Sequence, residues 1–178
     1  MTSATEPSTP ATIAPFPPET IAAFLALCAG DWLALRSRFS LEEASDEARQ
    51  AEEEEEVSWH SSERGELQVT YMAPEELDGP GGLEISPPSG GRHRLLFQPD
   101  GGFQGQAPDG AVSTGRWQLW PDGSLELSSE RAGTSVRERI WFTKANLRLR
   151  SSVEHLPDGR PGRASFSSEI RRVSRPAG

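Results

Sequence analysis

The hydrophobic pattern predicts a short helix as the first structured element of the chain. Four apolar residues, Ile21, Phe24, Leu25 and Cys28, lie three or four positions apart, which places them on one face of a helix. Gly30 follows this run and is a typical helix stop. Because Cys28 lies on the apolar face, we interpret it as a small core residue rather than a reactive thiol.

From Trp32 onward the pattern alternates with the period of two that is typical of β-strands. Residues 78–91 interrupt the alternation with Gly and Pro, and we expect a loop there. The tripeptide Pro-Asp-Gly occurs at 99–101, 108–110, 121–123 and 157–159, and each copy predicts a tight turn. The predicted strands are 32–41, 66–72, 92–98, 102–106, 112–120, 124–131, 135–142, 146–154 and 163–173.

Consecutive strands joined by short turns indicate an all-β, mainly antiparallel fold. We expect a lipocalin-like up-and-down β-barrel with a short N-terminal helix, because a barrel has no free strand edges and can hold a ligand. The length of 178 residues suits one domain, which we place at 19–175. Residues 1–18 contain five prolines and predict a disordered tail. Residues 42–56 contain nine acidic side chains and predict a solvated acidic loop.

Charge is divided unevenly between the two halves of the chain. Residues 1–90 carry four basic and 18 acidic side chains, whereas residues 91–178 carry 14 basic and nine acidic ones, for a net charge of −9 overall. A pI near 4.9 argues against nucleic-acid binding. The sequence shows no membrane span and no secretory signal, and we expect a cytoplasmic protein. One cysteine and three scattered histidines are too few for a disulfide or a zinc site.

The candidate chemistry lies near the C-terminus. Arg148, Arg150 and Ser152 alternate onto one face of a strand. If the Asp158-Gly159 turn is the centre of a hairpin, paired residue numbers sum to 317 and Glu169 faces Arg148. Two guanidinium groups beside a carboxylate suit a ligand that has carboxylates and ring N–H groups. The alternative is a solvated ladder of ion pairs on the outer face of the barrel.

Several motifs resemble the S-type phycobiliprotein chromophore lyases, the CpcS/CpeS-like family. The family pattern runs from E-R-x-W-F through N-L-R-x-R-[ST]-S to F-x-S-E-[IV]-R. It is matched here by Glu138, Arg139, Trp141, Phe142, Asn146, Leu147, Arg148, Arg150, Phe166, Ser168, Glu169 and Arg171. The N-terminal part, with Phe24, Gly30, Trp32 and Arg36, is similar to the opening of the same family, and Gly115-Arg116-Trp117 to its G-R-[YW] strand start.

This resemblance implies a phycobiliprotein lyase, an enzyme that binds an open-chain tetrapyrrole such as phycocyanobilin or phycoerythrobilin. The enzyme attaches this bilin to a cysteine of a phycobiliprotein subunit through a thioether. The bilin is then a substrate, with no permanently bound cofactor and no metal. The partners are phycobiliprotein subunits, and the active unit could be a homodimer or a heterodimer with a related lyase.

The resemblance also implies roles for particular side chains. Glu169 and Arg148 would be catalytic, with Glu169 close to the pyrrole nitrogens. Propionates of the bilin would be bound by Arg148 and Arg150, or by one of them with Arg36. Trp32 and Trp141 would contact the rings, and Ser152 is a further ligand-binding candidate.

One departure from the family pattern lies in the middle of the chain. Members commonly have a strand of the form W-x-G-T-x-E-W-D, whereas residues 79–106 contain no tryptophan. Phe97 could substitute for it, or the bilin or acceptor preference could differ. Two alternatives to a lyase therefore stay open: a non-catalytic bilin carrier with the same barrel, and a phycobilisome assembly chaperone that has lost the chromophore site.

Overall fold

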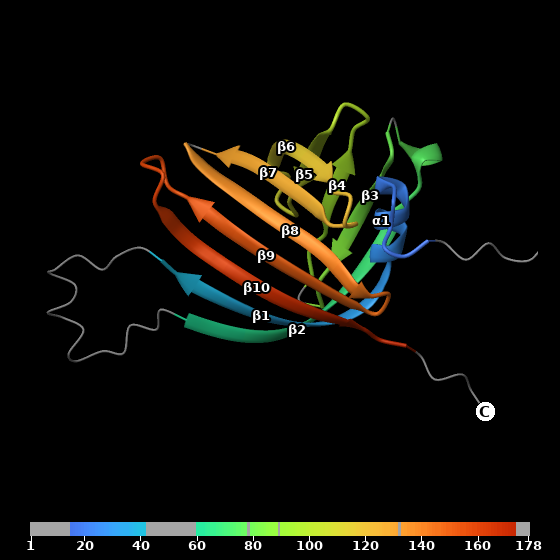
Figure 1. Cartoon of the computed structure of the whole chain (residues 1–178), viewed down its shortest axis with the longest axis horizontal. Coiled ribbons are helices and arrows are strands. Elements are labelled where there is room, and N and C mark those ends of the chain that lie inside the picture. Colours follow the sequence, from blue (N-terminus) through green and yellow to red (C-terminus); the bar gives the residue numbers. More distant parts are fainter. Residues whose placement is uncertain (1–14, 42–59, 78, 89, 132, 174–178) are drawn as a thin grey trace, which may run out of the picture.

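The computed structural model describes residues 15–41, 60–77, 79–88, 90–131 and 133–173. One α-helix, one 3-10 helix and ten strands make up this part of the chain (Figure 1). Their bounds are α1 Ile21–Cys28, β1 Gly30–Ser40, β2 His60–Met72, η1 Pro74–Glu76, β3 Gly81–Ser86, β4 His93–Phe97, β5 Gly102–Gln106, β6 Val112–Leu119, β7 Leu125–Arg131, β8 Thr134–Lys144, β9 Leu147–His155 and β10 Pro161–Arg171.

The strands form a closed antiparallel barrel in which each strand pairs with its neighbours in sequence. The order is β1-β10-β9-β8-β7-β6-β5-β4-β3-β2, and β1 closes the barrel by pairing with both β10 and β2. The predicted all-β up-and-down barrel with an N-terminal helix is confirmed. The expected loop at 78–91 is wrong in part, because β3 lies within it and pairs with β2 and β4.

The four Pro-Asp-Gly tripeptides form the predicted turns. They connect β4 to β5, β5 to β6, β6 to β7, and β9 to β10. In each turn the Asp carboxylate accepts a hydrogen bond from the backbone N–H two residues later, at 2.8–3.0 Å. The Gly that follows has φ between 76° and 84°, a conformation that glycine adopts without steric cost.

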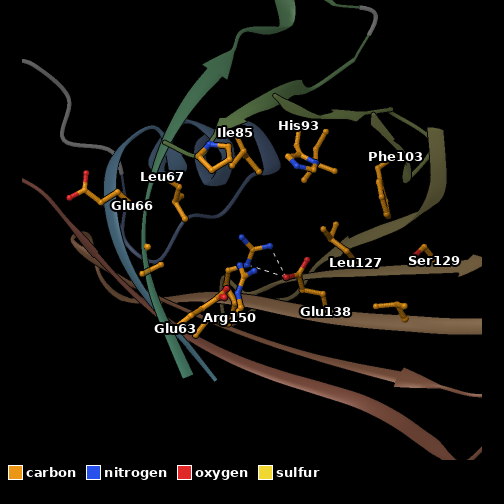
Figure 2. Close-up of a pocket in the computed structure, with 16 residues that line it drawn as sticks. Glu63, Glu66, Leu67, Ile85, His93, Phe103, Leu127, Ser129, Glu138 and Arg150 are labelled. Atoms are coloured by element: carbon orange, nitrogen blue, oxygen red, sulfur yellow. Dashed lines mark hydrogen bonds and ion pairs between the residues drawn. The ribbon is translucent and has the colours of Figure 1, made fainter. Parts of the chain in front are cut away.

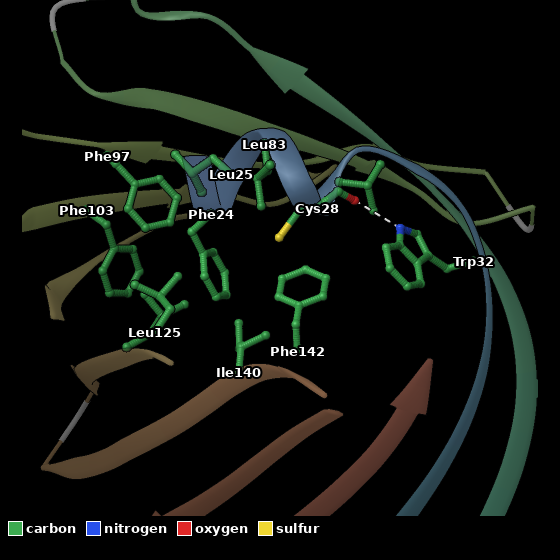
Figure 3. Packing of buried hydrophobic residues seen from close by; sticks show 12 residues of the cluster. Phe24, Leu25, Cys28, Trp32, Leu83, Phe97, Phe103, Leu125, Ile140 and Phe142 are labelled. Atoms are coloured by element: carbon green, nitrogen blue, oxygen red, sulfur yellow. Dashed lines mark hydrogen bonds between the residues drawn. The ribbon is translucent and has the colours of Figure 1, made fainter. Parts of the chain in front are cut away.

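Helix α1 lies at one end of the barrel and contributes to its core (Figures 1 and 3). Thr20 caps the helix, since its hydroxyl oxygen accepts the Ala23 N–H at 3.2 Å. Phe24, Leu25 and Cys28 are buried, and the Phe24 ring packs edge-on against Phe142 of β8. The helix therefore closes this end with the apolar face that the spacing predicted, and Cys28 is a core residue as expected.

Two sequence predictions fall wholly or partly outside the described residues. The acidic segment 42–56 and the first part of the predicted tail, residues 1–14, are among those that the structure does not describe. Residues 15–18 are described, and Pro18 is buried. Among the described helices, none is long and apolar enough to cross a membrane.

Candidate ligand-binding cavity

A cavity of about 510 Å³ lies inside the barrel (Figure 2). Its volume is in the range that is usual for small-molecule sites. The apolar part of its wall comes mainly from Leu67, Ile85, Leu95, Phe103, Leu127 and Val136. The charged and titratable side chains in the wall are Arg36, Glu63, Glu66, His93, Glu138 and Arg150. A mostly apolar wall with a few converging polar groups is typical of a site for an amphipathic ligand.

Arg150 and Glu138 form an ion pair at the cavity wall, across from His93 and Phe103 (Figure 2). The guanidinium donates to Glu138 Oε1 from Nη2 at 2.6 Å and from Nε at 3.0 Å. Burial by itself would lower the pKa of Arg150, but the negative charges of Glu138 and Glu169 outweigh it and raise that pKa. Arg150 is therefore a permanent cation inside the barrel.

Arg148 and Glu169 form a second ion pair behind Arg150. The two residues are direct cross-strand partners on β9 and β10, which confirms the predicted register, and Ser167 faces Arg150 in the same register. Arg148 Nε donates to Glu169 Oε2 at 2.5 Å, and the two side chains are 3% and 0% exposed. This burial excludes the solvated outer ladder. Neither residue is part of the cavity wall; Arg148 borders a much smaller void with Cys28.

The second oxygen of Glu169 connects the two ion pairs. Glu169 Oε1 lies 3.7 Å from Arg150 Nη1. It is buried, and no donor among the described residues makes a hydrogen bond to it. The carboxylate therefore contacts two guanidinium groups with its single negative charge, and its Oε1 has unused acceptor capacity.

Arg36 differs from the other two arginines because it has no carboxylate partner among the described residues. It projects from β1 into the cavity wall, and its guanidinium makes one long hydrogen bond to the described residues, from Nε to Ser167 Oγ at 3.5 Å. Burial, followed by repulsion from Arg150, lowers its pKa. Glu169 and Glu138 attract this charge from a distance, but none of the described carboxylates contacts it. A cavity guanidinium without a directly bound carboxylate is suited to bind an anionic group of a ligand.

The other predicted ligand contacts are not in the cavity wall. Ser152 faces inward and its hydroxyl hydrogen-bonds to Ser165 at 2.7 Å. Trp32 is fully buried, and its indole N–H donates to the Cys28 carbonyl at 2.9 Å (Figure 3). Trp141 lies on the outer face of β8, between the inward-facing Ile140 and Phe142, and its ring packs near Phe166. The structure thus places Arg36 and Arg150 in the cavity wall. Ser152, Trp32 and Trp141 lie outside that wall.

Glu138 is the ion-pair partner of Arg150 in the cavity wall, and sequence reasoning did not select it. It was noted only as part of a motif, although alternation contains the information needed to place it. Residues of β8 and β9 pair so that their numbers sum to 290, which sets Glu138 opposite Ser152 and next to Arg150 on the inner face. Within the described residues, no group of three His, Cys, Asp or Glu side chains could hold a metal ion.

Comparisons with known proteins agree with this architecture. A family model described as CpeS-like protein matches residues 104–172. The chain is 43% identical over 161 residues to chromophore lyase CpcS/CpeS 1 of Paulinella chromatophora, a match that covers 90% of this chain and 92% of the relative. The chain belongs to the CpcS/CpeS family of chromophore lyases.

Two further matches show how this CpcS/CpeS family member relates to others. A 60-residue segment, 34% of this chain and 34% of the relative, is 48% identical to chromophore lyase CpcS/CpeS 1 of Trichodesmium erythraeum. The solved S-type phycobiliprotein lyase CPES from Guillardia theta has the same fold, with a TM-score of 0.59 and 20% identity. That alignment covers 85% of this chain and 92% of the Guillardia chain.

Proposed function

We propose that the protein is a phycobiliprotein lyase that binds an open-chain tetrapyrrole in the barrel cavity and directs its attachment to a cysteine of a phycobiliprotein subunit. Membership of the CpcS/CpeS family supports the activity. The observation that carries the proposal is Arg36, which contacts no described carboxylate, beside the Arg150–Glu138 pair in a mostly apolar cavity. We further propose that it acts in the cytoplasm, with phycobiliprotein subunits and the bilin as its partners.

The cavity groups match the functional groups of a bilin. A bilin has two propionates, flat apolar rings and pyrrole N–H groups. Arg36 can bind one propionate through charge-assisted hydrogen bonds, and Arg150 in the same wall is a second cation. Glu138 faces the same space and can accept a pyrrole N–H or share its proton. Leu95, Phe103 and Leu127 supply apolar contacts for the rings.

The reaction is the addition of a thiol to a carbon–carbon double bond. The acceptor sulfur forms a bond to the ethylidene carbon on ring A, and the thiol proton ends on the tetrapyrrole, so that no group leaves. A carboxylate near the pyrrole nitrogens can hold the proton that makes the ethylidene carbon electrophilic. A barrel that fixes the bilin in one conformation also sets which face the thiol attacks.

Cys28 is not the nucleophile in this proposal. It is 1% exposed, and burial raises the pKa of its thiol although the neighbouring Arg148 opposes the shift. The attacking thiol must therefore come from the acceptor subunit.

Co-expression with a bilin source and candidate phycobiliprotein subunits tests the proposal. We expect a covalently pigmented subunit that keeps its colour after denaturation, and no pigment when the protein is left out. A red-shifted bilin bound to the protein without transfer would instead indicate a carrier. Subunit binding without any change in bilin absorption would indicate an assembly chaperone. An absence of pigment on every subunit, while a CpcS/CpeS lyase succeeds in parallel, would overturn the proposal.

A further inference from the structure

Arg171 of β10 binds the end of helix α1. It faces inward like Glu169, two residues earlier, and its guanidinium donates to the carbonyls of Ala29 and Leu27, the latter at 2.5 Å. Gly30 makes this approach possible, since it has φ of 131° and a Cβ at that position would lie 2.5 Å from Arg171 Nη1. The side chain therefore ties β10 to the helix that closes the barrel.

Trp32 completes the same contact and joins it to the ion pairs. Its indole N–H binds the Cys28 carbonyl, so Arg171 and Trp32 together engage the carbonyls of three consecutive residues at the end of α1. The Trp32 ring lies 4.3 Å from the Arg171 guanidinium carbon and 4.5 Å from that of Arg148. Guanidinium groups at this distance are attracted to an indole ring. The Trp32 ring thus packs against the guanidinium of Arg148.

Contacts continue from Arg148 to the cavity. Arg148 Nε is hydrogen-bonded to one oxygen of Glu169, and the other oxygen lies 3.7 Å from Arg150. Arg150 is in the cavity wall. Each of these side chains except Arg150 and Arg171 is nearly or fully buried, so that few alternative rotamers are open to them. Two hydrogen bonds from Nε and Nη2 to Glu138 hold Arg150, and a continuous series of contacts that begins at Arg171 reaches its Nη1 through Glu169.

We propose that Arg171 and Trp32 are positioning residues for chromophore transfer: they hold Arg148 and Glu169 in one arrangement and thereby orient Arg150 toward the bilin. The inference rests on the proposed function for its catalytic consequence. It assigns Trp32 a role through Arg148 in place of direct contact with the rings, and it gives Arg171 a role beyond helix capping.

The substitution Arg171→Lys tests the inference. Lysine keeps the charge and can still donate to a carbonyl, but it lacks the planar group that stacks on the indole. We expect bilin affinity within twofold of wild type and a transfer rate at saturating bilin about tenfold lower. Arg163→Lys is the matched control, because Arg163 of the same strand is 80% exposed and pairs with Glu154, and neither residue is in the cavity wall. Trp32→Phe, which keeps a ring but no N–H, is the second variant should Arg171→Lys fold poorly.

A double-mutant cycle separates positioning from a general structural role. If Arg171 acts through Arg148, Arg171→Lys combined with Arg148→Lys should transfer no more slowly than Arg148→Lys alone. Losses that multiply would overturn the inference. A third readout needs no bilin: the Arg148 Nε–H proton should exchange with water about tenfold faster in Arg171→Lys than in wild type, and at the wild-type rate in Arg163→Lys. Unchanged exchange in both would also overturn it, whereas absence of transfer by wild type would count only against the proposed function.

Discussion

At the scale of single residues, the cavity arginines differ in whether their charge is already neutralised. Arg148 and Arg150 have carboxylate partners at 2.5 and 2.6 Å, whereas Arg36 has none among the described residues. Sequence alternation alone could not distinguish these cases, because partner distances depend on how neighbouring strands pair. We therefore propose Arg36, in place of Arg148, as the main propionate-binding residue.

Replacing Arg36 should weaken bilin binding directly. We expect Arg36→Ala to lower the affinity for a bilin by roughly tenfold or more, since a hydrogen bond to a charged group contributes about 1.5–3 kcal/mol. Absorption titration measures the effect. Arg94→Ala is the control, because Arg94 is half exposed and pairs with Glu84 away from the cavity. Equal affinities of the two variants would show that Arg36 does not contact the ligand.

Glu169 should matter for folding as well as for activity. Glu169→Gln leaves the buried Arg148 charge without its counter-charge, and breaking such a pair costs about 3–5 kcal/mol of unfolding free energy. Urea unfolding measures the loss. Glu154→Gln removes a 3.8 Å pair with Arg163, whose side chain is 80% exposed, and should cost less than about 1 kcal/mol. Similar losses in both variants would contradict the buried ion pair.

Cys28 should be unreactive while the protein is folded. Burial raises the pKa of its thiol, so the thiolate fraction at about pH 8.5, the usual thiol pKa, is lower than in the unfolded chain. The stability that this neutral thiol contributes is present below that pH and lost as the pH rises above it. We expect slow alkylation of the native protein and fast alkylation in urea. Rapid modification of the native state would show that Cys28 is accessible.

Trp141 and Glu138 show why the site was only partly predictable from residues. The motif suggested that Trp141 contacts the bilin, but Ile140 and Phe142 on either side are buried in the core. An odd-numbered residue between them must face outward, and the same alternation puts Glu138 inside. The family pattern identified the right strands, whereas the direction of each side chain required the register.

At the scale of elements, the Pro-Asp-Gly turns allowed the hairpins to be predicted. The glycines of β3, in contrast, made that strand look like a loop. The Asp158-Gly159 turn correctly gave the pairing of Arg148 with Glu169. Close to this turn Pro161 pairs with His155, so the register there differs by one residue from that of the other β9–β10 pairs. β3 was missed because Gly81 and Gly82 at its start and Pro87 after its end are typical of loops, and only Leu83 and Ile85 mark its inner face.

The glycines of β3 are required by close packing, and a substitution can verify this. Gly81 has φ of 122°, and a Cβ there would lie 2.9 Å from the Met72 carbonyl oxygen. We expect Gly81→Ala to lower the unfolding free energy by about 1–3 kcal/mol. Gly65→Ala of β2 is the control, since a Cβ there would contact nothing within 4 Å. Equal stability of Gly81→Ala and wild type, measured by urea unfolding, would contradict the close contact with β2.

At the scale of the whole molecule, part of the charge in the second half of the sequence lies inside the barrel. Strands β8, β9 and β10 come from that half and place Arg148 and Arg150 inside, where Glu138 and Glu169 from the same strands neutralise them. The closed barrel was predictable from consecutive hairpins. The volume of the cavity and the identity of its wall were not, because they depend on contacts between residues such as Arg36, Phe103 and Arg150 that are distant in sequence.

The central claim is that this cavity binds an open-chain tetrapyrrole. Adding the purified protein to a bilin and recording the absorption spectrum tests it most directly. We predict a red-shifted, sharpened long-wavelength band that saturates at one bilin per barrel, because the cavity fixes one extended conformation and surrounds it with charged groups. A spectrum identical to that of the free bilin at every protein concentration would contradict the account.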